Sequence, residues 1–253
     1  MVFIKTPEQI KKIKISGKIL ASVAKELKKN ITEGAVLKDL DLLAKKLIRD
    51  AGAEPAFLGY QPHGADHPFP ASICASLNEV VVHGIPNKYK LKSGDILKLD
   101  FGVSYQGFIT DSAFTAGVGR ISGEAQKLMD VTKHSLMLGI KECRPGKTLG
   151  DIGWAVNDYV TKNGFKVVKG LCGHGVGIEL HEEPSVFNEG QKNTGLQLRP
   201  GMILALEPMV SAGDPYIVQT EQESYATRDG SLSAHFEHTV LITERNPEIL
   251  TNY

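Results

Sequence analysis

The sequence predicts one α+β domain, residues 1–253, in which helical segments alternate with antiparallel β-strands. No Gly/Ser/Pro-rich linker divides the 253 residues, so we expect a single domain. Helical apolar periodicity alternates along the chain with short β-type runs. A ten-residue pattern also occurs twice, once in each half of the chain, which indicates two related helix-plus-strand units.

We expect four helices. A capping box over residues 6–9 begins the first helix, and Gly34 is expected to end it. The second begins at Leu37 and ends at Gly52, and two more cover about residues 124–143 and 149–163. Strands are expected over five runs, at residues 79–83, 96–101, 108–114, 202–206 and 238–243.

The internal repeat places one acid in each half of the chain. Residues 91–100 (LKSGDILKLD) align with residues 198–207 (LRPGMILALE), with five of ten positions identical. Each copy is a glycine turn, a β run and a terminal acid, Asp100 in the first and Glu207 in the second. If the repeat reflects a duplicated half-domain, a pseudo-twofold axis brings both acids to one site. The alternative is a chance likeness between two apolar strands.

A hairpin is expected to bring Asp100 close to Asp111. With Tyr105-Gln106 as its two-residue loop, the two aspartates lie directly opposite each other, with Cβ atoms about 4.5–5.5 Å apart. Like charges so placed are destabilising unless a cation lies between them. The alternative is a different register with two solvated aspartates, although the surrounding side chains are apolar.

Further metal-binding side chains follow these aspartates. His174 lies in the glycine-rich run Gly173–Gly177, and Glu207 and Glu237 lie at the edges of later β runs. Glycines let the backbone approach closely and leave the imidazole free to point at a ligand. Four carboxylates with one or two imidazoles and no thiolate suit two divalent ions, such as cobalt, manganese, iron or zinc. Such pairs of ions occur in aminopeptidase-type hydrolysis.

Six separated motifs together resemble those of the type I methionine aminopeptidases. They are Asn78–Pro86, Leu99–Gly102, Thr110-Asp111, Gly173–Gly177, Glu207-Pro208 and Phe236–Thr239. The resemblance runs in order from about Thr6 to the C-terminus. It implies the pita-bread fold of that family, a curved antiparallel sheet with helices and halves related by a pseudo-twofold axis.

The resemblance also implies roles for individual residues. The implied metal ligands are Asp100, Asp111, His174, Glu207 and Glu237, of which Asp111 and Glu237 bridge two ions. Glu207 would in addition accept the proton of the attacking water. His181 would hydrogen-bond the scissile carbonyl or its oxyanion, and His83 would hold the substrate amide and assist the departing amine.

A pocket for the first side chain is implied as well. Its lining would be Phe57, Tyr60, Phe69 and Cys74, together with His83, an apolar slot suited to a thioether. The loop at 61–69 is about six residues longer than usual in the family and contains His63, Asp66 and His67. We expect surface variation there, with a substrate lid or an adventitious metal site as alternatives. Leu180 and Glu223 stand where the family often has aromatic residues.

The expected function is removal of the initiator methionine from nascent proteins whose second residue is small. One alternative is an Xaa-Pro peptidase, a prolidase or aminopeptidase P. Those enzymes usually carry an additional N-terminal domain, for which 253 residues leave no room. Another alternative is a non-catalytic pita-bread binding protein, against which the complete ligand set argues.

The amino-acid composition indicates where in the cell the protein acts and which classes of partner it binds. The three cysteines have no paired spacing, and no secretory or membrane segment is visible, so we expect a cytoplasmic protein and, from the resemblance, a monomer. A formal net charge of zero argues against a protein built mainly to hold nucleic acid. Residues 1–50 nevertheless hold 12 Lys/Arg and 6 Asp/Glu. They form either solvated helix faces or a basic patch for weak attachment to the ribosome.

Overall fold

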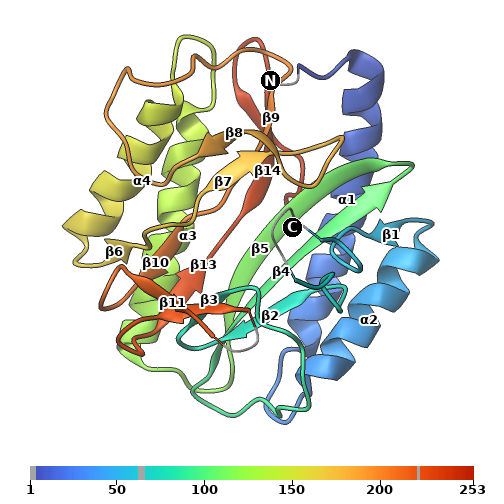
Figure 1. The fold of residues 1–253 in the computed structure, drawn as a ribbon, viewed down its shortest axis with the longest axis vertical. Coiled ribbons are helices and arrows are strands. Elements are labelled where there is room, and N and C mark those ends of the chain that lie inside the picture. The colour runs from blue at the N-terminus through green and yellow to red at the C-terminus, as the bar shows by residue number, and fades with distance from the viewer. Residues whose placement is uncertain (1–3, 62–65, 221–222) are drawn as a thin grey trace.

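Two pairs of helices lie on either side of a set of antiparallel strands in the computed structural model, which describes residues 4–61, 66–220 and 223–253 (Figure 1). The helices of these residues are α1 (Pro7–Asn30), α2 (Leu37–Asp50), α3 (Gly123–Glu142) and α4 (Leu149–Lys162). All four expected helices are therefore present. The first ends at Asn30, earlier than expected, and Gly34 adopts a left-handed conformation (φ +86°) in the turn that follows.

Reciprocal caps explain where two of the helices begin. In α1 the Gln9 backbone N–H donates to the Thr6 hydroxyl (3.3 Å), and the Thr6 N–H donates to the Gln9 side chain (2.8 Å). Thr148 and Asp151 form the same box at the start of α4. Each box satisfies N–H groups that have no partner within the helix. The capping box expected from the sequence is confirmed.

Over the described residues, the strands form four antiparallel sheets rather than one uninterrupted sheet. The first contains β1 (Glu54–Pro55), β2 (Cys74–Leu77), β4 (Ile96–Tyr105) and β5 (Phe108–Gly117). The largest has the order β15 (Pro247–Ile249), β14 (His238–Ile242), β9 (Ile203–Leu206), β7 (Gly173–Gly175) and β8 (Glu182–Val186). Two three-stranded ladders have the orders β13 (Ser233–His235), β10 (Met209–Ser211), β6 (Lys166–Val167) and β11 (Ile217–Gln219), β12 (Tyr225–Thr227), β3 (Val80–Val82).

The predicted register of the β4–β5 hairpin is wrong by two residues. Tyr105 pairs with Phe108, so the two-residue loop is Gln106-Gly107, and both loop residues have positive φ (52° and 79°). That conformation is the one a right-twisted hairpin favours, and it requires a residue such as glycine. Asp111 therefore lies opposite Gly102 and only diagonally from Asp100. A shift of two residues keeps both aspartates on the same face, because side chains alternate with a period of two.

The internal repeat corresponds to two similar structural units. A helix pair precedes each copy, α1–α2 before β4 and α3–α4 before β9. Gly94 and Gly201 occupy the same position in the turn of each copy, with positive φ values of 103° and 86°. Leucines from both units, such as Leu99 and Leu206, belong to one buried apolar cluster.

Among the described residues, no helix has both the length and the apolar character that a membrane span needs.

Candidate metal centre and active site

One cavity of about 1220 Å³ is lined by every residue that the sequence predicts for the site. Its lining includes the predicted ligands Asp100, Asp111, His174, Glu207 and Glu237, the histidines His83 and His181, and the pocket residues Phe57, Tyr60, Phe69 and Cys74. These residues come from both halves of the chain and from at least six strands and loops. The fold thus brings together side chains that are far apart in the sequence.

One threonine hydroxyl and one backbone hydrogen bond align Asp111 and Glu237. The Asp111 N–H donates to the Thr239 hydroxyl (2.9 Å), which in turn donates to the Asp111 carbonyl (2.7 Å). Two residues along, the Glu237 N–H donates to the Ala113 carbonyl (2.8 Å). The backbone between β13 and β14 therefore runs antiparallel to β5, with a hydroxyl in place of the usual backbone pairing. This arrangement fixes the main chains that carry both carboxylates.

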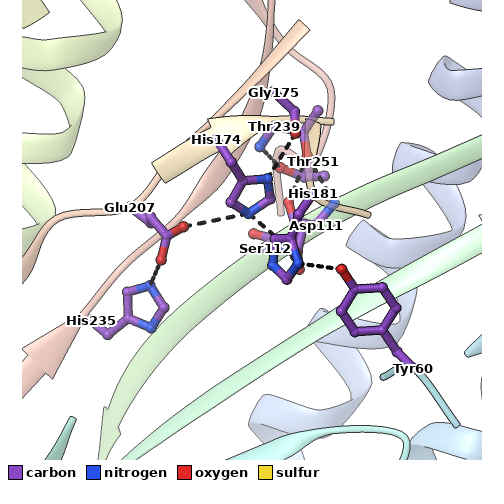
Figure 2. Close-up of polar contacts among 10 residues, drawn as sticks. All are labelled: Tyr60, Asp111, Ser112, His174, Gly175, His181, Glu207, His235, Thr239 and Thr251. Atoms are coloured by element: carbon purple, nitrogen blue, oxygen red, sulfur yellow. Dashed lines mark hydrogen bonds and ion pairs between the residues drawn. The ribbon is translucent and has the colours of Figure 1, made fainter. Parts of the chain in front are cut away.

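His174 lies between two glycines, Gly173 and Gly175, at which neighbouring strands approach the backbone closely. A Cβ at Gly173 would meet the Ala205 carbonyl oxygen at 2.3 Å, so only glycine lets β7 approach β9 this closely. The Nδ1 atom of His174 lies 2.9 Å from the Gly175 carbonyl oxygen, which accepts a hydrogen bond from Nδ1–H. The Nε2 atom is then free and faces carboxylates, 3.5 Å from Glu207 Oε1 and 3.9 Å from Asp111 Oδ2 (Figure 2).

The carboxylates of the site are crowded and poorly solvated. Burial, followed by neighbouring carboxylates, raises the pKa of Asp100, Glu207 and Glu237 well above their ordinary values. Burial raises the pKa of Asp111 to about 7. Asp100 Oδ1 and Glu237 Oε1 are buried without a hydrogen-bond partner in the part of the chain that the structure describes.

This donor set fits divalent cations. Ligand atoms of Asp111, His174 and Glu237 all lie within 4.8 Å of one another, as do those of Glu207, His235 and Glu237. Unpartnered buried carboxylate oxygens are costly unless a cation neutralises them. Oxygen-rich sites with one or two imidazoles accept manganese, iron, cobalt and zinc. The residues therefore have the chemistry that a metal centre requires.

Two further histidines face the cavity beside this cluster. His181 is exposed to the cavity, and its Nδ1 atom lies 2.8 Å from the Tyr60 hydroxyl (Figure 2). Loss of surrounding solvent, with smaller contributions from His174 and His83, lowers the pKa of His181, which favours a neutral imidazole. His83 has a left-handed backbone (φ 60°), and its ring packs against Tyr225 with centroids 5.8 Å apart.

An apolar slot adjoins the polar cluster. Phe57, Cys74 and Leu180 pack together in one buried cluster, with Tyr60 and Phe69 against it. The described part of the long loop lies at the cavity, since exposed Asp66 and His67 are among its lining residues. His63 lies outside the described residues. Glu223 also lines the cavity, and the aromatic wall close to it is Tyr225, which the sequence reasoning missed.

His235 is a second residue that the sequence reasoning missed. Its side chain is 1% exposed, and its Nε2 atom lies 3.3 Å from Glu207 Oε2. Burial lowers the pKa of His235 to about 3, so the ring is neutral. A signal was available, because residues two apart on an extended chain point to the same side and His235 precedes Glu237 by two.

The sequence and the fold both match one peptidase family. The profile of metallopeptidase family M24 matches residues 11–244. The chain is 44% identical to methionine aminopeptidase 1 of Bacillus subtilis over 99% of both chains. The crystal structure of methionine aminopeptidase from Thermotoga maritima covers all of both chains at 43% identity and a TM-score of 0.95.

A more distant likeness concerns the fold alone. The prolidase from Pyrococcus furiosus gives a TM-score of 0.79 at 21% identity, over 99% of this chain and 65% of that one. The predicted α+β pita-bread fold is therefore confirmed. With a family match across most of its length, and with curated relatives more than 40% identical, the chain belongs to metallopeptidase family M24, whose members use divalent metal ions.

Proposed function

We propose that the chain removes the N-terminal methionine from nascent proteins when the second residue is small. The observation that carries this proposal is one cavity in which an apolar slot adjoins a buried carboxylate–imidazole cluster. The slot, with its Phe57–Phe69 edge-to-face pair and Cys74, suits an unbranched thioether. The similarity to methionine aminopeptidases along the whole chain supports the same substrate class.

The metal centre that we propose holds two divalent ions. Asp100, Asp111, His174, Glu207 and Glu237 would hold these ions. When bound, such ions act as Lewis acids that lower the pKa of a coordinated water and polarise a carbonyl. Cobalt, manganese, iron and zinc all suit this donor set.

The side chains around the centre divide the remaining work. Glu207 accepts a proton from the attacking water, because its carboxylate borders the cavity and its raised pKa makes it a better base than an ordinary glutamate. Neutral His181, held by Tyr60, donates from Nε2 to the oxyanion that develops. His83 binds the substrate amide. The free α-amine of the substrate would bind at the metal centre, which confines cleavage to the first residue.

A peptide panel tests this function. We expect chelator-stripped protein reloaded with each candidate metal to release methionine from Met-Ala-Ser. Met-Leu-Ser should be cut slowly, because little space remains for a large second side chain, and Leu-Ala-Ser should be cut poorly. A faster rate on Ala-Pro peptides would favour a prolidase-like function instead. No turnover of any peptide with any metal would favour a binding protein.

The proposed partner is the N-terminus of a nascent protein. The proposed enzyme is a cytoplasmic monomer that binds this N-terminus at the ribosome. Three exposed lysines, Lys11, Lys18 and Lys25, lie on one face of α1 because they are seven residues apart. Lys28, which also belongs to α1, is not included with these three lysines, because its ammonium lies over the rings of Phe114 and Tyr253. Co-sedimentation with ribosomes should weaken steeply as salt rises and when the three lysines are changed to glutamate.

A further inference from the structure

His235 faces one oxygen of the Glu207 carboxylate, and His174 faces the other. His235 Nε2 lies 3.3 Å from Oε2, whereas His174 Nε2 lies 3.5 Å from Oε1 (Figure 2). The ring of His235 is buried, and within the described residues neither of its nitrogens has a hydrogen bond of good geometry. A buried imidazole without partners is costly, so its place beside Glu207 calls for an explanation.

The backbone of His235 is held firmly. Its N–H donates to the Thr115 hydroxyl (2.9 Å), and that hydroxyl donates to the His235 carbonyl (2.7 Å). On its other side, His235 pairs with Met209 in the ladder of β13 and β10. The imidazole therefore projects from a backbone fixed by two neighbouring strands. Its position next to Glu207 is a property of the fold and not of a mobile loop.

The two histidines differ in a way that separates their roles. A metal-ligating imidazole usually donates its other N–H to a carbonyl or carboxylate. His174 has such a contact, from Nδ1 to the Gly175 carbonyl, and His235 has none. A neutral imidazole carries a single N–H, and Glu207 Oε2 is an acceptor that lies 3.3 Å from Nε2. The 3.3 Å separation is slightly longer than the usual range of about 2.7–3.2 Å.

We propose that His235 is a positioning residue that donates from Nε2 to Glu207 Oε2 and so turns Oε1 toward His174 and the metal centre. The side-chain amide of Asn188 donates to the Glu207 carbonyl (3.0 Å), which holds the main chain of Glu207 in place. His235 supplies the matching restraint on the carboxylate. This inference rests on the proposed role of Glu207 as a metal ligand and proton acceptor.

The test compares His235→Leu, which removes the donor, with His235→Gln, which keeps an N–H donor at similar reach. Cobalt and manganese binding to chelator-stripped protein is measured by calorimetry, and kcat and KM are measured separately. We expect Leu to weaken metal affinity and to lower kcat roughly 10–100-fold, the usual effect of losing such a partner. Gln should restore both to within about threefold, and KM should change little in either variant.

A second measurement does not depend on whether a variant folds. In zinc-loaded wild-type protein with ¹⁵N-labelled histidine, NMR should find the His235 proton on Nε2. A zinc-dependent shift of the Nε2 resonance with no proton on Nε2 would make His235 a direct ligand, and the positioning role would be wrong. Wild-type metal affinity and kcat in the Leu variant would also overturn it. If the wild-type protein itself binds no divalent metal, the proposed metal centre is wrong. This result is distinct from the two results that would contradict the positioning role.

Discussion

His174 and His181 lie against each other but are held by different partners. Their ring centroids are 4.5 Å apart. The Nδ1 atom of His174 contacts a backbone carbonyl, whereas that of His181 contacts the Tyr60 hydroxyl. His174 thereby presents an unprotonated Nε2 to the carboxylates. With Tyr60 donating to Nδ1, His181 keeps its proton on Nε2 and presents a donor to the substrate.

Replacing each histidine by alanine should therefore give two different defects. We expect His174→Ala to bind one ion weakly and to recover part of its activity in excess metal. His181→Ala should bind metal normally, change KM little and lose about 10²–10³-fold in kcat. Calorimetry and steady-state kinetics measure the two effects. If His181→Ala loses metal while His174→Ala retains it, the two roles are exchanged.

Tyr60→Phe tests the proton placement on His181. Without the hydroxyl, His181 can carry its proton on either nitrogen, so the donor to the oxyanion is present only part of the time. We expect kcat to fall roughly 10-fold with metal affinity unchanged. Tyr216→Phe removes an exposed hydroxyl outside the cavity and serves as the matched control. Unchanged kcat in Tyr60→Phe would show that the hydroxyl does not set the tautomer.

At the scale of elements, the β4–β5 hairpin shows what sequence reasoning could and could not predict. The two strands and the shared face of Asp100 and Asp111 were predictable from apolar patterning around an acid pair. A loop at Tyr105-Gln106 ignores the glycine requirement of a tight hairpin turn, which favours Gln106-Gly107. Weighing turn chemistry before charge proximity would have given the correct register.

Gly107→Ala measures how strongly the turn fixes this hairpin. Gly107 has φ +79° and no atom within 4 Å of an added Cβ, so the cost of alanine comes from the backbone conformation alone. We expect a loss of about 1 kcal/mol in the free energy of unfolding, measured with denaturant. Gly123→Ala, which also meets nothing within 4 Å but has no positive φ, should be neutral or slightly stabilising. Equal stability of the two variants would contradict the turn assignment.

At the scale of the whole molecule, the site depends on pairings that no local pattern encodes. The ligand set could be predicted because a resemblance carried each residue to its position. His235 lies outside the six motifs, so the resemblance does not identify it, and only its spacing of two residues from Glu237 points to the site. Its relation to Glu207 arises only when β13 pairs with β10 and Thr115 holds its backbone. Long-range ladders of this kind are a property of the tertiary structure.

Metal binding should make the stability of the molecule depend on pH in a particular way. The folded-state pKa of Asp111 is raised to about 7, so in metal-free protein its stabilising contribution is full at low pH. That contribution is lost as pH rises from the ordinary value toward 7, because the unfolded chain ionises first. A bound cation requires the ionised form, so its stabilisation grows over the same range.

The difference in Tm between metal-loaded and chelated protein should accordingly be larger at about pH 7.5 than at about pH 5.5. Asp111→Asn removes one of the four carboxylates of the site with a raised pKa, so it should weaken this dependence. Asp130→Asn, which changes an exposed carboxylate of α3, should leave it unchanged. A difference in Tm that is the same at both pH values would contradict the assignment.

The central claim is that a metal centre in this cavity removes N-terminal methionine, and one measurement tests it most directly. Bound metal per chain is determined in protein stripped with a chelator and reloaded in steps, and the rate of methionine release from Met-Ala-Ser is recorded at each step. We predict no activity without metal and a rate that rises with occupancy of the site. Full activity in protein shown to be free of metal would contradict the account.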